Sequence, residues 1–334
     1  MSLDISAKTI EPIRMTYSHI ARRIGEGKPA SRYQEATFDI QPTANFQYRP
    51  LWDKEHEIYD AGRTTIVMED WYAFSDPRQY YYGVYTQTRA KQQDNVDNNF
   101  KFVEARGLLE NLPTDVRDKV LTCLMPLRHT EWGANMNNCA ITDMGYGVAI
   151  TQATMFNSMD RLGLAQYITR MGLLLSENDT TILDVAKSAW LEDEIWQGLR
   201  HAVEDTFVLD DWFEVLVAQN IVMDGMIYPL IFGDLVDDLV ARNGAAIGMM
   251  TDFQNQWAKE TVRWTDSLLK VTAAESDENK KHLTRWIEQW LERIHQALVP
   301  LANAAFDGDG ESRLENVKKA LTERVNKQGL EVSS

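Results

Sequence analysis

The chain has 334 residues and a formal charge of −16, with 10 Trp and 12 Tyr. This length can hold two domains or one long helical bundle. The acidic balance argues against binding to nucleic acid or to an anionic membrane surface. The first residues lack the apolar stretch of a signal peptide, and no apolar run approaches the roughly 20 residues of a membrane helix, so we expect a cytoplasmic protein. Cys123 and Cys139 lack metal-binding spacing and indicate reduced thiols.

Residues 1 to about 80 carry five of the nine prolines and many scattered aromatic side chains. Apart from a short helix expected near Tyr17–Ile24, this segment shows little helical periodicity. Since such a composition buries itself poorly, we predict an extended arm that lies on another protein, with Phe46, Tyr48 and Trp52 among its anchors. The alternative is that the arm packs back on its own bundle, as loops commonly do.

From Tyr80 onward, apolar residues recur at helical spacing, which predicts a helical bundle over residues 81–275 and C-terminal helices packed on it over residues 276–334. The helices are expected at Tyr80–Glu110, Thr114–Asp143, Val148–Leu175, Ala189–Leu199, Val208 to either Pro229 or Leu239, Phe253–Leu268, Leu283–Leu298 and Leu314–Val325. Pro126 should kink the second helix because its ring removes a backbone donor and pushes against the preceding turn. Gly163 is a candidate interruption of the third.

Di-iron carboxylate bundles hold their metals with one Glu from each of two helices and Glu-x-x-His from each of two others. One literal Glu-x-x-His occurs, from Glu292 to His295, and it has no second copy. We interpret it as a surface pair. The sequence contains no nucleophile elbow and no glycine-rich phosphate loop, and its clusters of acidic residues lack the spacing of a calcium loop.

Four segments stand in a familiar order: VEARGLLENLP, PLRHTEWGANMNN, WFEVLVAQN and WAKETVRW. With DPRQYYYGVYTQTRAKQQ and the GYG at residues 145–147, they resemble the hydroxylase components of bacterial multicomponent monooxygenases. The β subunit of phenol hydroxylase is the closest in pattern, followed by those of toluene monooxygenases, and the resemblance extends over nearly the whole chain. It implies an all-α, ferritin-like (ribonucleotide reductase-like) bundle and a role in hydroxylating phenol or similar arenes.

The resemblance also suggests where metal ligands would lie. Four of the six ligand positions keep a ligand residue and two lose it: Glu104, His129, Glu214 and Glu260 are kept, whereas Pro126 and Arg263 replace a Glu and a His. Because a guanidinium stays protonated and does not ligate metals, we expect a vestigial site with no metal, no catalytic residue and no cofactor in this subunit. We further expect Arg263 to be buried and paired with Glu260 or Glu104, and His129 to be a hydrogen-bonded core histidine.

By the same resemblance, the di-iron centre belongs to the catalytic α subunit, and NAD(P)H, FAD and a 2Fe-2S cluster belong to a reductase. The implied partners are the α subunit, a small γ subunit, a second αβγ protomer, a regulatory protein and the reductase. Two alternatives stay open. One is an autonomous di-iron protein such as a ribonucleotide reductase small chain or a ferritin, and the other is an unrelated helical scaffold.

Overall fold

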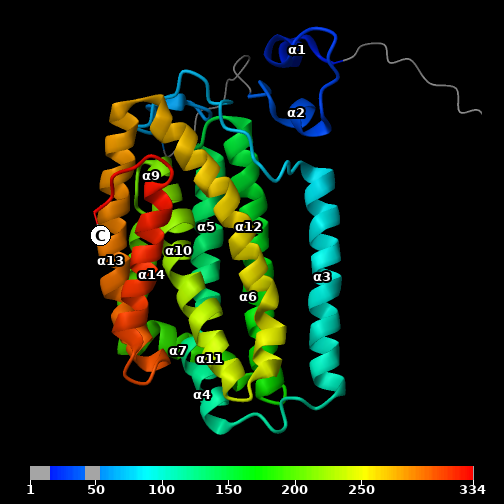
Figure 1. Ribbon diagram of the computed structural model, residues 1–334, viewed down its shortest axis with the longest axis vertical. Helices are drawn as coiled ribbons and strands as arrows, with labels where there is room; N and C mark the ends of the chain where they lie inside the picture. Colours follow the sequence, from blue (N-terminus) through cyan, green and yellow to red (C-terminus); the bar gives the residue numbers. More distant parts are fainter. Residues whose placement is uncertain (1–15, 42–52, 334) are drawn as a thin grey trace, which may run out of the picture.

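The computed structural model describes residues 16–41 and 53–333, and this part of the chain is built from helices, with no strand (Figure 1). The all-α class is therefore confirmed. The helices before residue 210 are α1 (Ser18–Ile24), α2 (Arg32–Thr37), the short 3₁₀ helix η1 (Ala61–Arg63), α3 (Tyr82–Ala105), α4 (Thr114–Cys123), α5 (Leu127–Met144), α6 (Val148–Leu175), α7 (Thr181–Glu192) and α8 (Glu194–Thr206).

One continuous helix then covers residues 212–241 in five stretches, and three helices follow it. The five stretches are α9 (Trp212–Leu216), η2 (Val217–Met223), α10 (Asp224–Ile227), η3 (Tyr228–Leu235) and α11 (Val236–Ala241), and the later helices are α12 (Ala245–Glu275), α13 (Asp277–Ala305) and α14 (Gly310–Asn326).

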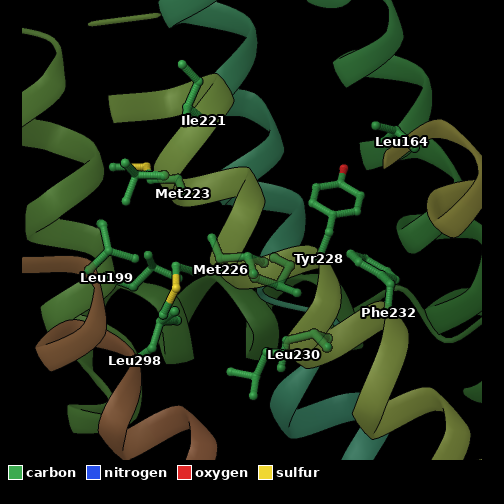
Figure 2. Packing of buried hydrophobic residues seen from close by; sticks show 14 of the residues in the cluster. Leu164, Leu199, Ile221, Met223, Met226, Tyr228, Leu230, Phe232 and Leu298 are labelled. Carbon is green, nitrogen blue, oxygen red and sulfur yellow. The ribbon is translucent and has the colours of Figure 1, made fainter. Parts of the chain in front are cut away.

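Four helices enclose the centre of the bundle: α5, α6, the helix at 212–241, and α12. α13 packs against α8, η2 and α12, and α14 packs against α13, α10 and η3. α3 lies on the opposite side of the bundle, where it contacts α12 (Figure 1). Figure 2 shows the apolar packing around the 212–241 helix, where Met226 and Leu230 lie among the side chains of neighbouring helices. The central helices are thus covered on several sides by the protein itself.

Pro126 breaks the predicted helix at 114–143 into α4 and α5, where we had expected only a kink. The chain leaves α4 at Leu124, and Pro126 adopts helical angles (φ −66°, ψ −17°) directly before α5. A proline suits the start of a helix because no backbone donor is needed there. α5 therefore begins at a position fixed by Pro126.

Two of the helices that follow differ from the predictions in their continuity. α6 runs through Gly163 without interruption. The helix expected through Ala189–Leu199 is split between α7 and α8 at Asp193, whose carboxylate accepts a hydrogen bond from the Ile195 backbone N–H. An aspartate in this role is a standard N-cap and gives a new helix its start.

The helix at 212–241 continues past Pro229 by switching to wider turns. Two of its stretches, η2 and η3, are π-helical, and Pro229 lies in the second. Insertion of a π turn accommodates local disruption of the α-helical ladder. Among the described residues, this is the one helix long and apolar enough to cross a membrane, whereas the sequence predictions included no apolar run of that length. Inside the protein, 94% of its most apolar window is buried. Its hydropathy therefore fits a core helix.

The segment before α3 packs on the ends of its own bundle where the structure describes it. The Thr65 backbone N–H donates to Asp211 at 2.7 Å, and Trp71 packs on Trp212 with ring centroids 5.8 Å apart. The Gly147 backbone, at φ +86°, donates to Gln41 at 3.1 Å. The described part of the predicted arm therefore packs back on its own bundle, which is the alternative that the sequence left open. The proposed anchors Phe46, Tyr48 and Trp52 lie outside the described residues.

Candidate functional site: the polar centre of the bundle

A buried ionic cluster lies between the four central helices. Arg161, on α6, donates from Nη1 to Glu131 of α5 at 3.0 Å and from Nη2 to Asp224 of α10. The hydroxyl of Tyr228 donates to the second oxygen of Glu131 at 2.7 Å, and the Gln219 amide donates to Asp224 at 3.1 Å. All five side chains are buried. Each carboxylate is thus held by the guanidinium and by one neutral donor.

Charge pairing sets the protonation of this cluster. Burial lowers the pKa of Arg161, but the charges of Asp224 and Glu131 outweigh burial and raise it, so Arg161 stays a cation. Burial raises the pKa of Glu131 and of Asp224, and Arg161 opposes that rise in both. The guanidinium also lies 4.4 Å from the ring centroid of Trp257. The Arg161 cation therefore fills the middle of the bundle, where two carboxylates and the face of the Trp257 ring surround it.

A buried layer of amides lies beside the ionic cluster. Asn220 donates to the side-chain oxygen of Asn138 at 2.9 Å, and Asn157 donates to Asn138 and Asn220 at 3.1 and 3.0 Å. Asn137 donates to Gln219 at 2.9 Å, which connects this layer to Asp224 through the Gln219 amide. Because buried polar groups are costly when unpaired, this network fixes the register of α5, α6 and the 212–241 helix.

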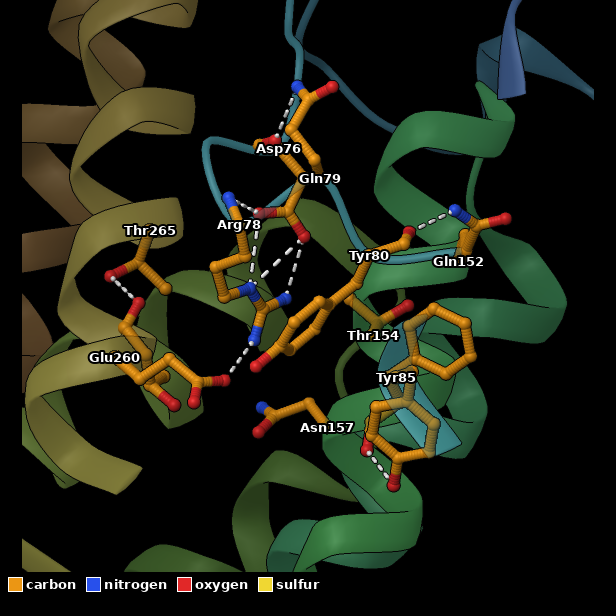
Figure 3. Close-up of polar contacts among 12 residues, drawn as sticks. Asp76, Arg78, Gln79, Tyr80, Tyr85, Gln152, Thr154, Asn157, Glu260 and Thr265 are labelled. Carbon is orange, nitrogen blue, oxygen red and sulfur yellow. Dashed lines mark hydrogen bonds and ion pairs between the residues drawn. The ribbon is translucent and has the colours of Figure 1, made fainter. Parts of the chain in front are cut away.

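A second ionic network joins α3 to the bundle. Arg89 of α3 pairs with Asp160 of α6 at 2.6 Å and with Glu260 of α12 at 2.7 Å. Arg78, in the segment before α3, pairs with Asp76 at 2.8 Å and reaches Glu260 at 3.4 Å, as Figure 3 shows. Burial raises the pKa of Glu260, but the hydrogen bonds and charge of Arg89 outweigh it and lower the pKa. Glu260 is therefore an ionised link between α3 and α12.

The centre does not fit a di-iron site. It offers two carboxylates and no histidine, and the Arg161 guanidinium occupies the space between the acids. Across residues 16–41 and 53–333, no group of three or more His, Cys, Asp or Glu side chains is placed to hold a metal ion. A pocket of about 550 Å³ reaches the edge of the cluster at Asp224, Tyr228 and Trp257, and Arg324 lies on its wall.

Residues 52–276 match the family described as Methane/Phenol/Alkene Hydroxylase, and this match covers more than half of the chain. The chain belongs to this family. Over 330 residues it is 46% identical to the oxygenase component DmpL of phenol 2-monooxygenase from Pseudomonas sp. (strain CF600), covering 99% of this chain and 98% of the relative. It is 24% identical over 301 residues to the hydroxylase component subunit beta of the toluene-4-monooxygenase system from Ectopseudomonas mendocina, covering 86% and 88%.

A solved structure gives the same result. The crystal structure of xenon-pressurized phenol hydroxylase from Pseudomonas sp. OX1 contains a chain that matches with a TM-score of 0.93 and 44% identity, covering 99% of this chain and 100% of that one. The ferritin-like fold and the predicted resemblance are confirmed. The chain is a component of a multicomponent monooxygenase, and the alternative of a ribonucleotide reductase small chain is wrong.

The six predicted ligand positions do not meet in one place. Glu104 is exposed on α3, 3.7 Å from Arg170. Glu214 accepts a hydrogen bond from the Trp290 ring N–H at 3.1 Å, far along the helix from the ionic cluster. Glu260 belongs to the second network, and Pro126 is buried at the start of α5. These positions belong to one sequence pattern of the family, but their side chains do not form one site.

The predictions for Arg263 and His129 need correction. Arg263 is exposed, and no ion pair among the described residues involves it, because it lies on the outer side of α12 while Glu260 turns toward Arg89. His129 stacks on Trp190 with centroids 6.0 Å apart, and its buried Nε2 has no hydrogen-bond partner in the described part of the chain. Burial, followed by the charges of Arg128 and Lys187, lowers the pKa of His129 to about 4.

The residues that do meet, Glu131, Arg161 and Asp224, were missed. The ligand pattern was placed on α3, α5, the 212–241 helix and α12, whereas α6 occupies the position given to α3. Two signals pointed to the cluster. Asp224 is a lone charge within the apolar stretch from Ile221 to Phe232, and Arg161 lies in the middle of a 28-residue helix that is mostly apolar.

Proposed function

We propose that this chain is the non-catalytic β subunit of the hydroxylase component of a cytoplasmic multicomponent phenol or arene monooxygenase. It would support a di-iron α subunit in an (αβγ)2 assembly, which works with a regulatory protein and with a reductase that carries FAD and a 2Fe-2S cluster and oxidises NAD(P)H. The full-length similarity to a phenol 2-monooxygenase oxygenase component supports this role.

One observation carries the non-catalytic part of the proposal. The Arg161 guanidinium, held by Glu131 and Asp224, occupies the middle of the bundle where a di-iron protein needs room and neutral or anionic ligands. A fixed positive charge there repels Fe²⁺, and no imidazole joins the two acids. In our proposal the oxygen chemistry belongs to the partner, and this chain supplies a rigid helical support.

Iron analysis tests the assignment. The chain should be purified alone, the catalytic subunit alone, and the two after co-expression, with metal content measured by inductively coupled plasma mass spectrometry. We expect iron in the co-expressed complex and far less than stoichiometric iron in this chain alone. Stoichiometric iron in the isolated chain would contradict the proposal.

An activity assay tests the assembly. The co-expressed complex, supplied with the reductase, the regulatory protein and NADH, should convert phenol to its hydroxylated product, and omission of this chain should abolish product formation. Full activity without this chain would exclude a supporting role.

A further inference from the structure

An uncharged apolar surface runs along α5 and α6 on the outside of the bundle. We call it the methionine face, and it consists of Trp132, Met136 and Cys139 on α5 and Met155, Met159 and Leu162 on α6. The two helices lie side by side, since the Asn135 amide donates to the Ser158 carbonyl oxygen at 2.9 Å. Trp132 is 54% exposed and Met155, Met159 and Leu162 are 40–47% exposed. These are large side chains for a surface in water.

Charge is missing from this surface. Residues 132–142 contain no charged side chain, and residues 148–169 contain only Asp160 and Arg161, both of which are buried. Charged residues make up 25% of the whole chain. Depletion of charge with enrichment in Met and Trp is the composition of the buried part of a protein interface.

The exposed residues of the methionine face recur at helical spacing on both helices. The exposed residues of α5 stand at positions i, i+4 and i+7, and those of α6 repeat the same spacing. Each helix also buries its opposite side in the core, where apolar residues alternate with the polar residues of the ionic cluster and the amide layer. A helix that is buried on one side and apolar on the other is expected to be covered on both sides in the functional assembly.

An aromatic pocket marks one border of the methionine face. It holds about 240 Å³ and is lined by the rings of His129, Trp132, Trp190 and Phe207, by Leu191 and Val203, and by the exposed charged residues Lys187 and Glu204. Phe207 is 41% exposed and meets the Trp132 ring edge-on at a centroid distance of 6.3 Å. His129 Nε2 is buried there without a partner among the described residues. Pockets of this kind receive the anchoring side chains of a partner.

Charged residues lie at the ends of the face, in addition to those that line the aromatic pocket. Where α5 begins and α6 ends, Glu104, Arg128 and Arg170 line a hollow, and Asp143 is exposed at the other end of α5. An uncharged centre with a charged border is the usual arrangement of a protein interface.

We propose that the methionine face and the aromatic pocket together form the surface on which the catalytic subunit docks. This inference rests on the proposed function. The relatives are named as components or as a subunit beta of a larger hydroxylase, so a second kind of subunit is available to cover the face. The partner surface would be a pair of helices that presents uncharged apolar side chains, with one aromatic or aliphatic side chain filling the pocket.

Two other occupants fit less well. A second copy would bring together two chains of charge −16, whose mutual repulsion opposes association. A lipid surface would be attracted by a cluster of exposed lysine or arginine, but the face carries neither, and the pocket has Lys187 together with the opposite charge of Glu204. A second copy is a distinguishable outcome of the experiments below.

Cys139 offers a probe that needs no mutation. It is exposed within the methionine face, whereas Cys123, the second cysteine of the chain, is buried. Maleimide labelling followed by peptide mass spectrometry should modify Cys139 in the free chain and leave Cys123 unmodified. In the complex with the catalytic subunit, Cys139 labelling should slow at least about tenfold. Equal labelling of Cys139 in the free chain and in the complex would overturn the proposal.

Substitutions test how much the methionine face contributes to the affinity for the catalytic subunit. The double variant Met136→Glu, Met159→Glu places two charges in the face, and the matched control Val185→Glu places one on α7, where Val185 is 60% exposed. We expect the double variant to weaken binding to the catalytic subunit about 100-fold or more. The control, and the double variant Met136→Leu, Met159→Leu, should bind as the unchanged chain does. Circular dichroism should be the same for all four proteins.

The outcomes separate this inference from the function on which it rests. If the unchanged chain forms no complex with the catalytic subunit, the proposed function fails. If it forms the complex and the double Glu variant binds equally well, only the docking surface is wrong. If size-exclusion chromatography shows a dimer of this chain alone that the double Glu variant abolishes, a second copy covers the face and the inference is overturned.

Discussion

Arg161 donates to Glu131 at 3.0 Å across the interface of α6 and α5, with both side chains almost fully buried. A buried pair of this kind contributes little net stability over a well-packed apolar pair, but removal of one partner strands the other charge. Asp224 shares the same guanidinium, so two acids depend on one base. The centre of the bundle is therefore sensitive to the loss of Arg161.

The first prediction follows from this dependence. Arg161→Ala should lower the free energy of unfolding by about 3–5 kcal/mol, since it leaves Glu131 and Asp224 buried without their cation. Urea denaturation at pH 7 measures the change. Arg170→Ala is the matched control, because Arg170 pairs with Asp97 at a half-exposed site and its loss should cost less than about 1 kcal/mol.

A neutralised variant separates charge from packing in this result. Arg161→Met combined with Glu131→Gln and Asp224→Asn removes all three charges and should be more stable than Arg161→Ala. If the triple variant is no more stable than the single one, stranded charge is not the cause of the loss.

The second prediction concerns pH and His129. Burial holds the folded His129 pKa at about 4, against 6.5 in the unfolded chain, so below pH 6.5 the unfolded state binds more protons. The contribution of His129 to the free energy of unfolding should therefore be constant above pH 6.5 and should fall as the pH drops toward 4. Discounted for partial exposure, the loss between pH 7 and pH 5 should be about 1 kcal/mol.

Urea denaturation at pH 7 and pH 5 measures this loss, with His129→Gln as the comparison. The variant should lose about 1 kcal/mol less than the unchanged chain over the same interval. Equal losses in the two proteins would place the acid sensitivity elsewhere.

The third prediction concerns the attachment of α3. Arg89→Met removes the cation that joins Asp160 and Glu260, so α3 should open from the bundle more often. Hydrogen exchange followed by mass spectrometry should show faster exchange in Tyr82–Ala105 and unchanged exchange in α13. Arg106→Met, at the exposed end of α3, is the control and should leave exchange as it is. Unchanged exchange of α3 in Arg89→Met would show that its other contacts, such as the hydrogen bond from Asn99 to the Met249 carbonyl oxygen, suffice to hold it.

The fourth prediction contrasts two residues of α12. Glu260→Ala removes one of the two acidic partners of both Arg89 and Arg78 and should lower the free energy of unfolding by about 2 kcal/mol. Arg263→Ala should change it by less than about 0.5 kcal/mol because Arg263 is exposed. Thermal denaturation of the two variants measures the difference. A larger effect from Arg263→Ala would restore the buried ion pair expected from the sequence.

The helices were predictable because their signals are local. Val148–Leu175 was predicted with the bounds that the structure gives, since its apolar residues recur at helical spacing up to the turn after it. The break at Asp193 was not predicted, because an aspartate inside a helical pattern becomes an N-cap only when the chain can turn there. Pro126 marked a disruption, but its consequence, a kink or a full break, depends on how α4 and α5 pack.

The polar centre was harder to predict because it depends on which helices are neighbours. Glu104 and Glu131 both lie on helical segments of the family pattern, yet α3 stands outside the four central helices and α5 stands within them. Spacing along the chain does not distinguish these two places. Arg161 could have been selected by its position within a long apolar helix, where a charge needs a buried partner.

The last prediction concerns the N-terminal segment, of which residues 16–41 are described. Removal of residues 1–45 takes away α1 and α2 and the contacts of Gln41 with Gly147 and of Tyr33 with the Asp76 backbone N–H, which it meets at 2.8 Å. Because these helices contain only 7 and 6 residues, the helical content measured by circular dichroism should fall only slightly. We expect co-purification with the catalytic subunit to weaken, since proline and aromatic residues provide large contacts at low entropic cost.

Two further variants locate the effect within the segment. Removal of residues 1–15 leaves α1 and α2 in place. The triple variant Phe46→Ala, Tyr48→Ala, Trp52→Ala tests the proposed anchors. If these residues contact the catalytic subunit, the triple variant should weaken binding at least about tenfold. Isothermal titration calorimetry with the catalytic subunit compares the three proteins. Undiminished affinity and full hydroxylation of phenol in all of them would rule out the N-terminal segment as an assembly device and leave that role to the helical surface of the bundle.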